Sequence, residues 1–197
     1  MSFREKYNKY LDLQQEDQKL LIATRSISSK NAVKNEYRKP ELKYTKVYRF
    51  ANEFKGTILG KIANQYLKRL SIKTGIQIPS DVEIGRGFVI GHFGCIVVNS
   101  KAVIGEDFII TQGCVVGMDM RGKRKGAPKI GNRVCMNANS VIVGNVTIGD
   151  DVLIAPNAFV NFDVPSHSIV VGNPATIHYR ANAVENHIGD RSKVDLL

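Results

Sequence analysis

Two short stretches of this chain gather the side chains best suited to chemistry. The first, Gly91-His92-Phe93-Gly94-Cys95, places an imidazole three residues before a thiol. An imidazole exchanges protons near neutral pH, and a thiol beside a base is a candidate nucleophile. The second, residues 117–129, carries the cations Arg121, Lys123, Arg124, Lys125 and Lys129. Such a stretch is either a solvated basic loop or a clamp for an anionic ligand such as a cofactor phosphate.

Both stretches interrupt a repeat of six residues that runs from Ile78 to Val164. Its first apolar position is filled in turn by Ile78, Ile84, Ile90, Val98, Ile104, Ile110, Val116, Ile130, Met136, Ile142, Ile148, Ile154 and Val160. The next residue is usually small or polar, and the residue four positions later is again apolar or small. A fixed short period indicates stacked units, each too small to bury its own apolar face.

A period of six fits neither a helix nor a simple alternating strand. We interpret it as a short strand, a sharp turn and another short strand, with the first and fifth positions pointing inward. The turn is expected directly after the first apolar residue, where Gly and Asn tolerate positive φ. Three units then make a triangular coil, and successive coils pair as parallel strands about 4.8 Å apart. The span predicts between four and five coils, with an ordinary β-sandwich as the alternative.

The segment before the repeat is expected to be helical. Residues 1–25 predict one helix, residues 26–46 read as a linker, and residues 48–70 predict an amphipathic helix. We expect the second helix to cap the open end of the coils or to pack against a neighbouring subunit. The predicted organisation is a basic helical segment at 1–75, a β-helix domain at 76–180 with a loop at 117–129, and a tail at 181–197.

The charge distribution limits the classes of partner. The net charge is +10, and residues 1–75 hold 17 Lys and Arg against 7 Asp and Glu, whereas the remainder is balanced at 11 and 11. The basic part lacks the interleaved aromatic residues of single-strand readers, so we expect no nucleic-acid role. With no long apolar run and no secretory signal, a cytoplasmic location is expected. A peripheral contact of the basic helices with the inner face of the membrane is an open alternative.

Three cysteines, Cys95, Cys114 and Cys135, give an odd number without metal-ligand spacing. This argues against a disulfide frame and against a zinc site, so no metal is predicted. Cys114 falls on an inward position and is interpreted as a small core residue.

Three stretches carry a resemblance to a known family: residues 84–98, residues 112–117 and residues 163–175. Together they resemble the hexapeptide-repeat acyltransferases over about residues 76–180. Within that family the chain looks most like serine acetyltransferases and their relatives in bacterial polysaccharide O-acetylation. The resemblance implies a mainly β fold, a left-handed parallel β-helix, that works as a homotrimer. It also implies acetyl-CoA as the donor of an acetyl group that is transferred directly to a hydroxyl.

The resemblance also implies roles for individual residues. His92 matches the catalytic histidine and would act as general base toward the hydroxyl. Gln77 stands where the family has an acid that orients this ring. Positions expected to contact the cofactor are Gly117, Ala138, Pro156, Asn161, Phe162, Arg180, Arg121 and Lys123. Positions expected to contact the acceptor are Gln112 and Phe93.

Departures from the serine acetyltransferase pattern point to the acceptor. The acid that directly precedes the catalytic histidine is Gly91 here, and an Arg-His pair in the long loop is Gly126-Ala127. Without groups for the ammonium and carboxylate of serine, we expect a saccharide acceptor in capsule, exopolysaccharide or lipopolysaccharide synthesis. Serine O-acetylation and a non-catalytic trimeric scaffold are the alternatives. The zinc carbonic anhydrase of this fold is not favoured, because it needs three converging histidines.

Overall fold

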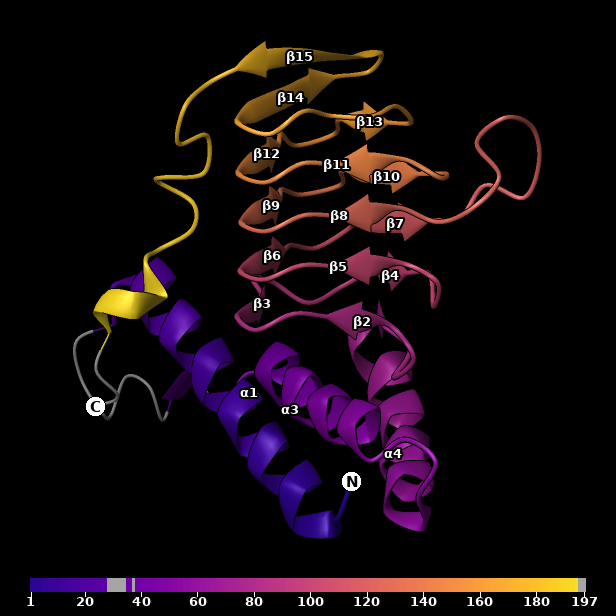
Figure 1. Cartoon of the computed structure of the whole chain (residues 1–197), viewed down its shortest axis with the longest axis vertical. Helices are drawn as coiled ribbons and strands as arrows, with labels where there is room; N and C mark the ends of the chain where they lie inside the picture. The colour runs from indigo at the N-terminus through magenta and orange to yellow at the C-terminus, as the bar shows by residue number, and fades with distance from the viewer. Residues whose placement is uncertain (28–34, 37, 195–197) are drawn as a thin grey trace.

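In the computed structural model, described for residues 1–27, 35–36 and 38–194, three helices precede a triangular β-helix (Figure 1). The helices are α1 (Phe3–Arg25), α3 (Pro40–Glu53) and α4 (Ile58–Thr74). No described helix is both long and apolar enough to cross a bilayer. The parallel β solenoid preceded by helices confirms the predicted fold class.

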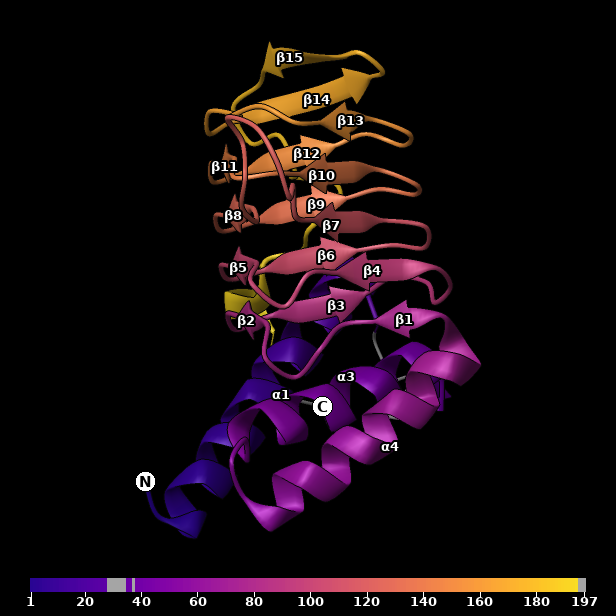
Figure 2. The same cartoon turned by 90° about the vertical axis from the view of Figure 1, so that its right-hand side faces the viewer.

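The strands stack into three sheets, one for each face of the triangle (Figures 1 and 2). Sheet A contains β1 (Ile76–Gln77), β4 (Ile96–Val98), β7 (Val115–Gly117), β10 (Val141–Val143) and β13 (Phe159–Val160). Sheet B contains β2 (Glu83–Ile84), β5 (Val103–Ile104), β8 (Lys129–Ile130) and β11 (Thr147–Ile148). Sheet C contains β3 (Phe88–Ile90), β6 (Phe108–Ile110), β9 (Val134–Met136), β12 (Val152–Ile154), β14 (Ser168–Gly172) and β15 (Ala175–Tyr179). All pairings are parallel except that of β14 with β15, which closes the far end.

The interior of the triangle is filled as the repeat predicts. Every residue at the first apolar position, from Ile78 to Val160, is buried, and outside the two interruptions so are the fifth positions from Val82 to Val164. Each coil therefore buries its apolar face against its neighbours in the stack, which is how short repeats become stable.

The expected site of positive φ is wrong by two residues. The left-handed conformation occurs three positions after the first apolar residue, for example at Asp107, Arg133 and Asp151. The glycines directly after the first apolar residue serve close approach instead. A Cβ on Gly105 would lie 2.5 Å from Asn132 Oδ1 and 2.7 Å from the carbonyl oxygen of Gly131 in the next coil.

The helical segment differs from the prediction at two places. The single helix expected over 48–70 is interrupted, because Gly56 adopts a φ of +84° and Thr57 begins α4 by capping it through its side chain. Residues 40–46, expected in the linker, belong to α3, which starts with Pro40 in its first turn. The part of that linker at residues 28–34 and 37 lies outside the described residues.

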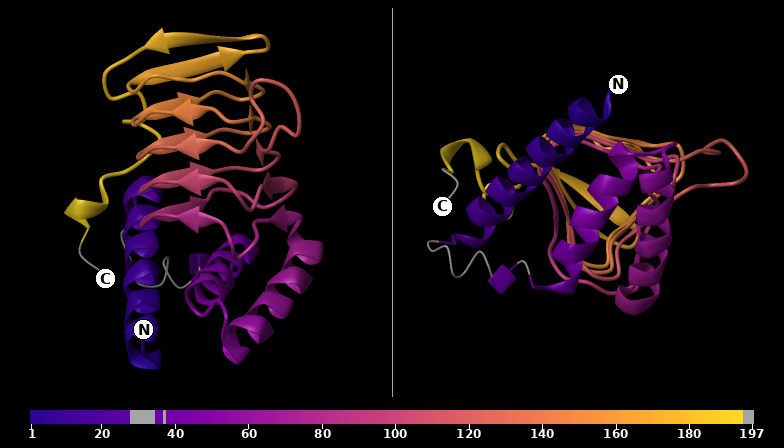
Figure 3. Two further views of the ribbon diagram at one scale, coloured as in Figure 1. Left: turned by 45° about the vertical axis from the view of Figure 1, so that its right-hand side comes forward. Right: turned by 90° about the horizontal axis from the view of Figure 1, so that it is seen from below.

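The helices close the open end of the β-helix, which is one of the two roles expected for the second one. Tyr44, Tyr48 and Ala51 of α3 join the buried core of the coils together with Leu67 and Leu70 of α4. Figure 3 shows α3 and α4 lying across the end of the triangle and α1 running beside sheet C. The first coil is thus covered by helices, which protects its unpaired strand edges.

Sheet C is also covered on its outer face. Leu20 and Leu21 of α1 pack there with Val184 and Ile188 of the C-terminal tail. The outward residues of the sheet, Val89, Ile109, Cys135 and Leu153, are consequently buried. Sheets A and B keep outward-facing side chains such as Val97 and Val103 exposed.

Candidate functional site

His92 lies on an enlarged corner between sheets C and A, formed by residues 91–95 and hereafter called the His92 corner. The backbone enters it through a hydrogen bond from Gly91 N to the carbonyl of Ile110 (2.8 Å) and leaves it through one from Ile96 N to the carbonyl of Gly75 (3.0 Å). In between, Gly94 has a φ of +118° and Cys95 a φ of +50°. The longer corner turns the side chains of His92 and Phe93 to the surface, where both are exposed.

Four predicted site residues form a column at the corner between sheets C and A. His92, Gln112, Ala138 and Pro156 each occupy the second residue after a sheet C strand, in successive coils. Backbone bonds hold the coils in this register, including Gly113 N to the carbonyl of Gly94 (2.9 Å) and Asn139 N to that of Gln112 (3.0 Å). Since coils repeat about every 4.8 Å, the column lines one edge of sheet A.

A second group of predicted residues lies at the opposite edge of sheet A. Gly117 ends β7, and the loop after it forms a hairpin closed by paired backbone bonds between Asp119 and Gly126 (3.0 Å each). Arg121 and Lys123 are exposed on this hairpin, which extends away from the coils in Figure 1. Asn161 and Phe162 follow β13 at the same edge, with Phe162 partly buried against the core. One chain therefore separates the His92 column from the basic hairpin by the width of sheet A.

The remaining predicted residues, Gln77 and Arg180, belong to neither of these two groups. Gln77 is exposed on the outer face of sheet A, where its strand pairs with Val97 of the next coil. Arg180 follows β15, and its backbone N–H donates to the carbonyl of His167 (2.8 Å) at the corner between sheets B and C. The fold does not bring Arg180 to either edge of sheet A.

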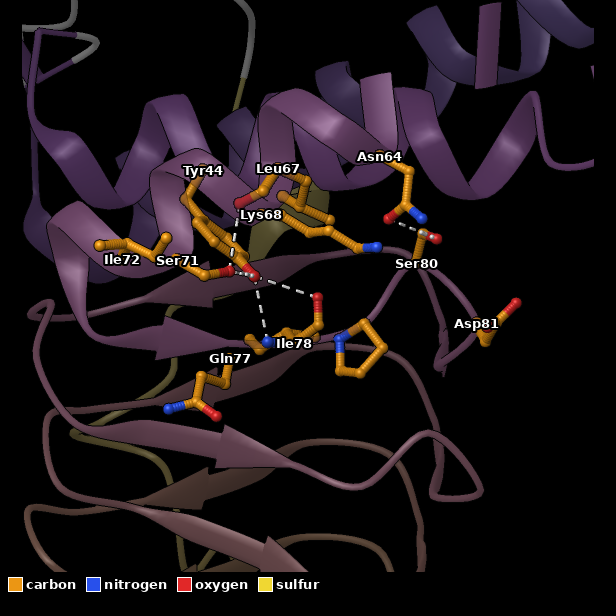
Figure 4. A pocket seen from close by; sticks show the side chains of 11 residues that line it. Tyr44, Asn64, Leu67, Lys68, Ser71, Ile72, Gln77, Ile78, Ser80 and Asp81 are labelled. Atoms are coloured by element: carbon orange, nitrogen blue, oxygen red, sulfur yellow. Dashed lines mark hydrogen bonds between the residues drawn. The ribbon is translucent and has the colours of Figure 1, made fainter. Parts of the chain in front are cut away.

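Gln77 also lines an open pocket of about 650 Å³ between α4 and the first coil (Figure 4). Its base is a polar network in which the Tyr44 hydroxyl donates to the carbonyl of Ile78 (3.1 Å) and lies 3.2 Å from Ser71 Oγ. Lys68 and Asp81 stand at its rim. His92 is not among the lining residues, so this pocket borders Gln77, the residue expected to orient the imidazole, and not His92 itself.

The hairpin carries an excess of positive charge. The cations of the hairpin, Arg121, Lys123, Arg124 and Lys125, form no ion pair with a carboxylate of the described residues. They are thus available to an anion.

Of the thiols, Cys95 is exposed, whereas burial raises the pKa of Cys135 to about 12 and so disfavours its thiolate.

One contact to the His92 corner was not predicted. Arg25, in the last turn of α1, donates from Nη2 to the carbonyl oxygen of Gly91 at 2.7 Å. Because the two residues are 66 positions apart, neither the repeat nor the motifs around His92 could have indicated it.

Comparison with known proteins supports the repeat. A family model described as bacterial transferase hexapeptide (six repeats) matches residues 127–161. A serine acetyltransferase of Helicobacter pylori is 39% identical over 102 residues, covering 52% of this chain and 60% of that protein. The chain therefore spans less than two thirds of that relative's length.

Solved structures agree with the fold. A Neisseria gonorrhoeae serine acetyltransferase in complex with serine has a TM-score of 0.73 at 26% identity, covering 88% of this chain and 73% of the other. A serine acetyltransferase in complex with CoA has a TM-score of 0.71 at 25% identity, covering 89% and 73%.

These relatives correct one expectation. A saccharide acceptor in polysaccharide synthesis was inferred from the missing acid at Gly91 and the missing pair at Gly126-Ala127. That inference is wrong, because the similar proteins and structures are serine acetyltransferases and support the alternative acceptor. In its repeat, in the family model that matches residues 127–161 and in its fold, the chain is similar to the hexapeptide-repeat transferases.

Proposed function

We propose that this chain is a serine O-acetyltransferase that takes its acetyl group from acetyl-CoA, with His92 as general base. The observation that carries the proposal is the exposed His92 at the head of a corner column beside sheet A. The similarity to serine acetyltransferases, including structures with serine and with CoA, supports the acceptor and the donor.

The chemistry follows from the properties of an imidazole. A serine hydroxyl is a weak nucleophile at neutral pH, and a base must remove its proton as the oxygen attacks. His92 accepts that proton while the serine oxygen bonds to the acetyl carbon and the carbon–sulfur bond breaks. The ring then returns the proton to the departing sulfur. The products are O-acetylserine and the free thiol, and His92 ends as it began.

The residues at the edges of sheet A fit a long anionic donor. The hairpin cations offer a site for phosphate groups. The corner residues Gln112, Ala138 and Pro156 would line a path that leads to His92. Phe162 would contact the adenine ring of the donor.

A homotrimer would unite the two edges. In one chain the hairpin and His92 lie on opposite sides of sheet A, and the outer face of sheet C is covered by α1 and the tail. A neighbouring copy that packs beside sheet A would bring its own edge toward the His92 column. We therefore expect the donor to bind between two copies of the chain.

The test is to incubate the protein with acetyl-CoA and L-serine, following release of the free thiol and the mass of O-acetylserine. His92→Ala is expected to lower turnover by roughly 10² to 10⁴ fold. His187→Ala is the matched control, because it removes an exposed histidine from the tail and should leave turnover within about twofold.

Two results would refute the proposal. Release of thiol without O-acetylserine would reject serine as the acceptor, and full activity of His92→Ala would reject the base.

A further inference from the structure

We propose that Arg25 is a positioning residue for His92, a proposal that rests on the function given above. It acts from α1, outside the β-helix, by holding the backbone of the His92 corner. It touches neither the serine nor the donor. Its effect would be to fix the peptide that joins Gly91 to His92.

The contact is directed at a segment with few other constraints. Within the His92 corner, the carbonyl of Gly91 accepts from Arg25 Nη2 at 2.7 Å, and the carbonyl of Gly94 accepts from Gly113 N at 2.9 Å. Among the described residues, Arg25 supplies the one side-chain hydrogen bond to the backbone of this corner. Without it, no hydrogen bond among the described residues would hold the Gly91–His92 peptide, and the nearest backbone bond would be that of the preceding peptide, from Gly91 N to the carbonyl of Ile110.

Arg25 is itself held in place by charge. Its Nη1 pairs with a carboxylate oxygen of Glu36, whose other oxygen lies 2.6 Å from Lys39 Nζ. Partial burial raises the pKa of Glu36, but the hydrogen bond from Lys39 and the charge of Arg25 outweigh it and lower the pKa below its usual value. Glu36 is therefore ionised at neutral pH and keeps the guanidinium aimed at the corner.

The helix that carries Arg25 is fixed to the strand that leads into His92. Asp17, two turns earlier on α1, accepts from the backbone N–H of Phe88 at the start of β3 (2.7 Å). Leu20 and Leu21 of the same helix pack on sheet C beside Val89. Helix α1 thus binds β3 at its first residue and the corner just after its last, so Arg25 extends from a rigid support.

The functional consequence is geometric. General-base catalysis requires the ring to lie within hydrogen-bond distance of the acceptor hydroxyl. A displacement of about 1 Å can lower a rate by up to about 10² fold. A peptide plane that is free to rotate would spread the orientations of His92, which lowers turnover while leaving substrate binding nearly unchanged.

The experiment compares Arg25→Ala, Arg25→Lys and Arg86→Ala in the full-length protein. Arg86 is the matched control, because it also joins the β-helix to α1, through an exposed ion pair with Asp12 at 3.0 Å, but does not contact the corner. We expect Arg25→Ala to lower kcat about tenfold, with the KM values for serine and acetyl-CoA within about twofold. Arg25→Lys keeps a cationic donor and should restore kcat to within about threefold, and Arg86→Ala should match the unaltered protein.

Hydrogen exchange gives a second readout that needs no turnover, at the amides of Gly91, Ile96 and Gly113, which bond the corner to its neighbours and are called the corner amides. It should accelerate in Arg25→Ala and not in Arg86→Ala. The proposal is overturned if kcat of Arg25→Ala stays within twofold, if the corner amides exchange as before, or if Arg86→Ala loses as much activity. If the unaltered protein acetylates no serine, the proposed function fails, and the exchange data alone decide whether Arg25 holds the corner.

Discussion

Asp17 of α1 and Arg49 of α3 form a two-pronged ion pair inside the protein, with N–O distances of 2.8 and 2.9 Å. Arg49 is 1% exposed and also donates to the carbonyls of Ile84 (2.6 Å) and Gly85 (2.7 Å), where the first coil turns toward sheet C. The pair therefore joins two helices to the first coil of the β-helix. Burial lowers the pKa of Arg49, but the charge and hydrogen bonds of Asp17 outweigh it and raise the pKa above its usual value, so Arg49 remains a cation.

Asp17→Ala should destabilise the fold strongly, because it leaves the Arg49 charge buried without its partner and removes the acceptor of Phe88 N. Loss of one member of a buried pair typically costs about 3–5 kcal/mol. Urea unfolding followed by circular dichroism measures the change in the free energy of unfolding. Asp12→Ala, which removes the exposed pair with Arg86, is the control and should cost less than about 1 kcal/mol. Equal effects of the two substitutions would contradict the assigned importance of burial.

Gly105→Ala tests the close approach of successive coils. The added Cβ would meet the carbonyl oxygen of Gly131 at 2.7 Å, which is backbone and cannot move aside. Overpacking of this kind costs about 1–3 kcal/mol. Asn137→Ala is the matched control, because Asn137 holds the same place in its repeat at another corner and already carries a Cβ. It should change the urea midpoint little, and a Gly105→Ala protein as stable as the original would reject the steric explanation.

The stability of the fold should depend on pH through Asp151, which accepts hydrogen bonds from the C-terminal tail. Burial raises the pKa of this carboxyl, but the hydrogen bonds from His167 Nδ1 (2.9 Å) and from the backbone N–H groups of Ala183 (2.9 Å) and Val184 (3.3 Å) outweigh it and lower the pKa below 3.8. A lowered folded-state pKa means that the carboxylate stabilises the fold above about pH 4. This contribution is lost as the pH falls below 3.8 through the folded-state pKa.

Scanning calorimetry from pH 7 to pH 2 checks this expectation. Asp151→Asn should have a lower Tm than the unaltered protein at pH 7, and the two values should converge toward pH 2. A difference in Tm that is the same at every pH would show that the carboxylate charge is not the cause.

The hairpin cations should act on donor binding. If they hold the phosphates, Arg121→Ala and Lys123→Ala should each raise the KM for acetyl-CoA by about 3–10 fold, as expected for loss of a charge-assisted contact. Acetyl-dephospho-CoA, which lacks the 3′-phosphate, separates the two phosphate sites, because a cation on that group should no longer matter with this donor. Lys101→Ala is the control, since Lys101 is exposed at the neighbouring corner outside the hairpin. Unchanged KM values for both variants would remove the hairpin from the site.

Much of the β-helix could be predicted because the period fixes which side chains face inward. Ile84, Ile104 and Ile130 are buried as the repeat requires. The break between α3 and α4 was not predicted, because the four-residue apolar spacing continues from Phe54 to Ile58 across it. Gly56 was the available signal, since a left-handed residue ends a helix.

The candidate site could be predicted only where its residues lie in local sequence motifs. His92 and the corner residues above it follow from motifs and register, whereas the contact of Arg25 depends on how α1 packs on sheet C. The acceptor was misjudged because the absence of charged groups at Gly91 and Gly126-Ala127 does not exclude others supplied by distant segments. Similarity to serine acetyltransferases over half the chain is the stronger evidence.

The regular stacking of the coils fixes the distances between residues along one edge of the β-helix. His92 stands in its first coil and Pro156 three coils further along the same edge, so the distance between them is set by the number of coils, at about 4.8 Å each. Deleting one whole coil would shorten that distance by one step and leave each remaining corner unchanged. If the proposed thioester lies along this edge, the length that it must span is set by the number of coils and not by any single side chain.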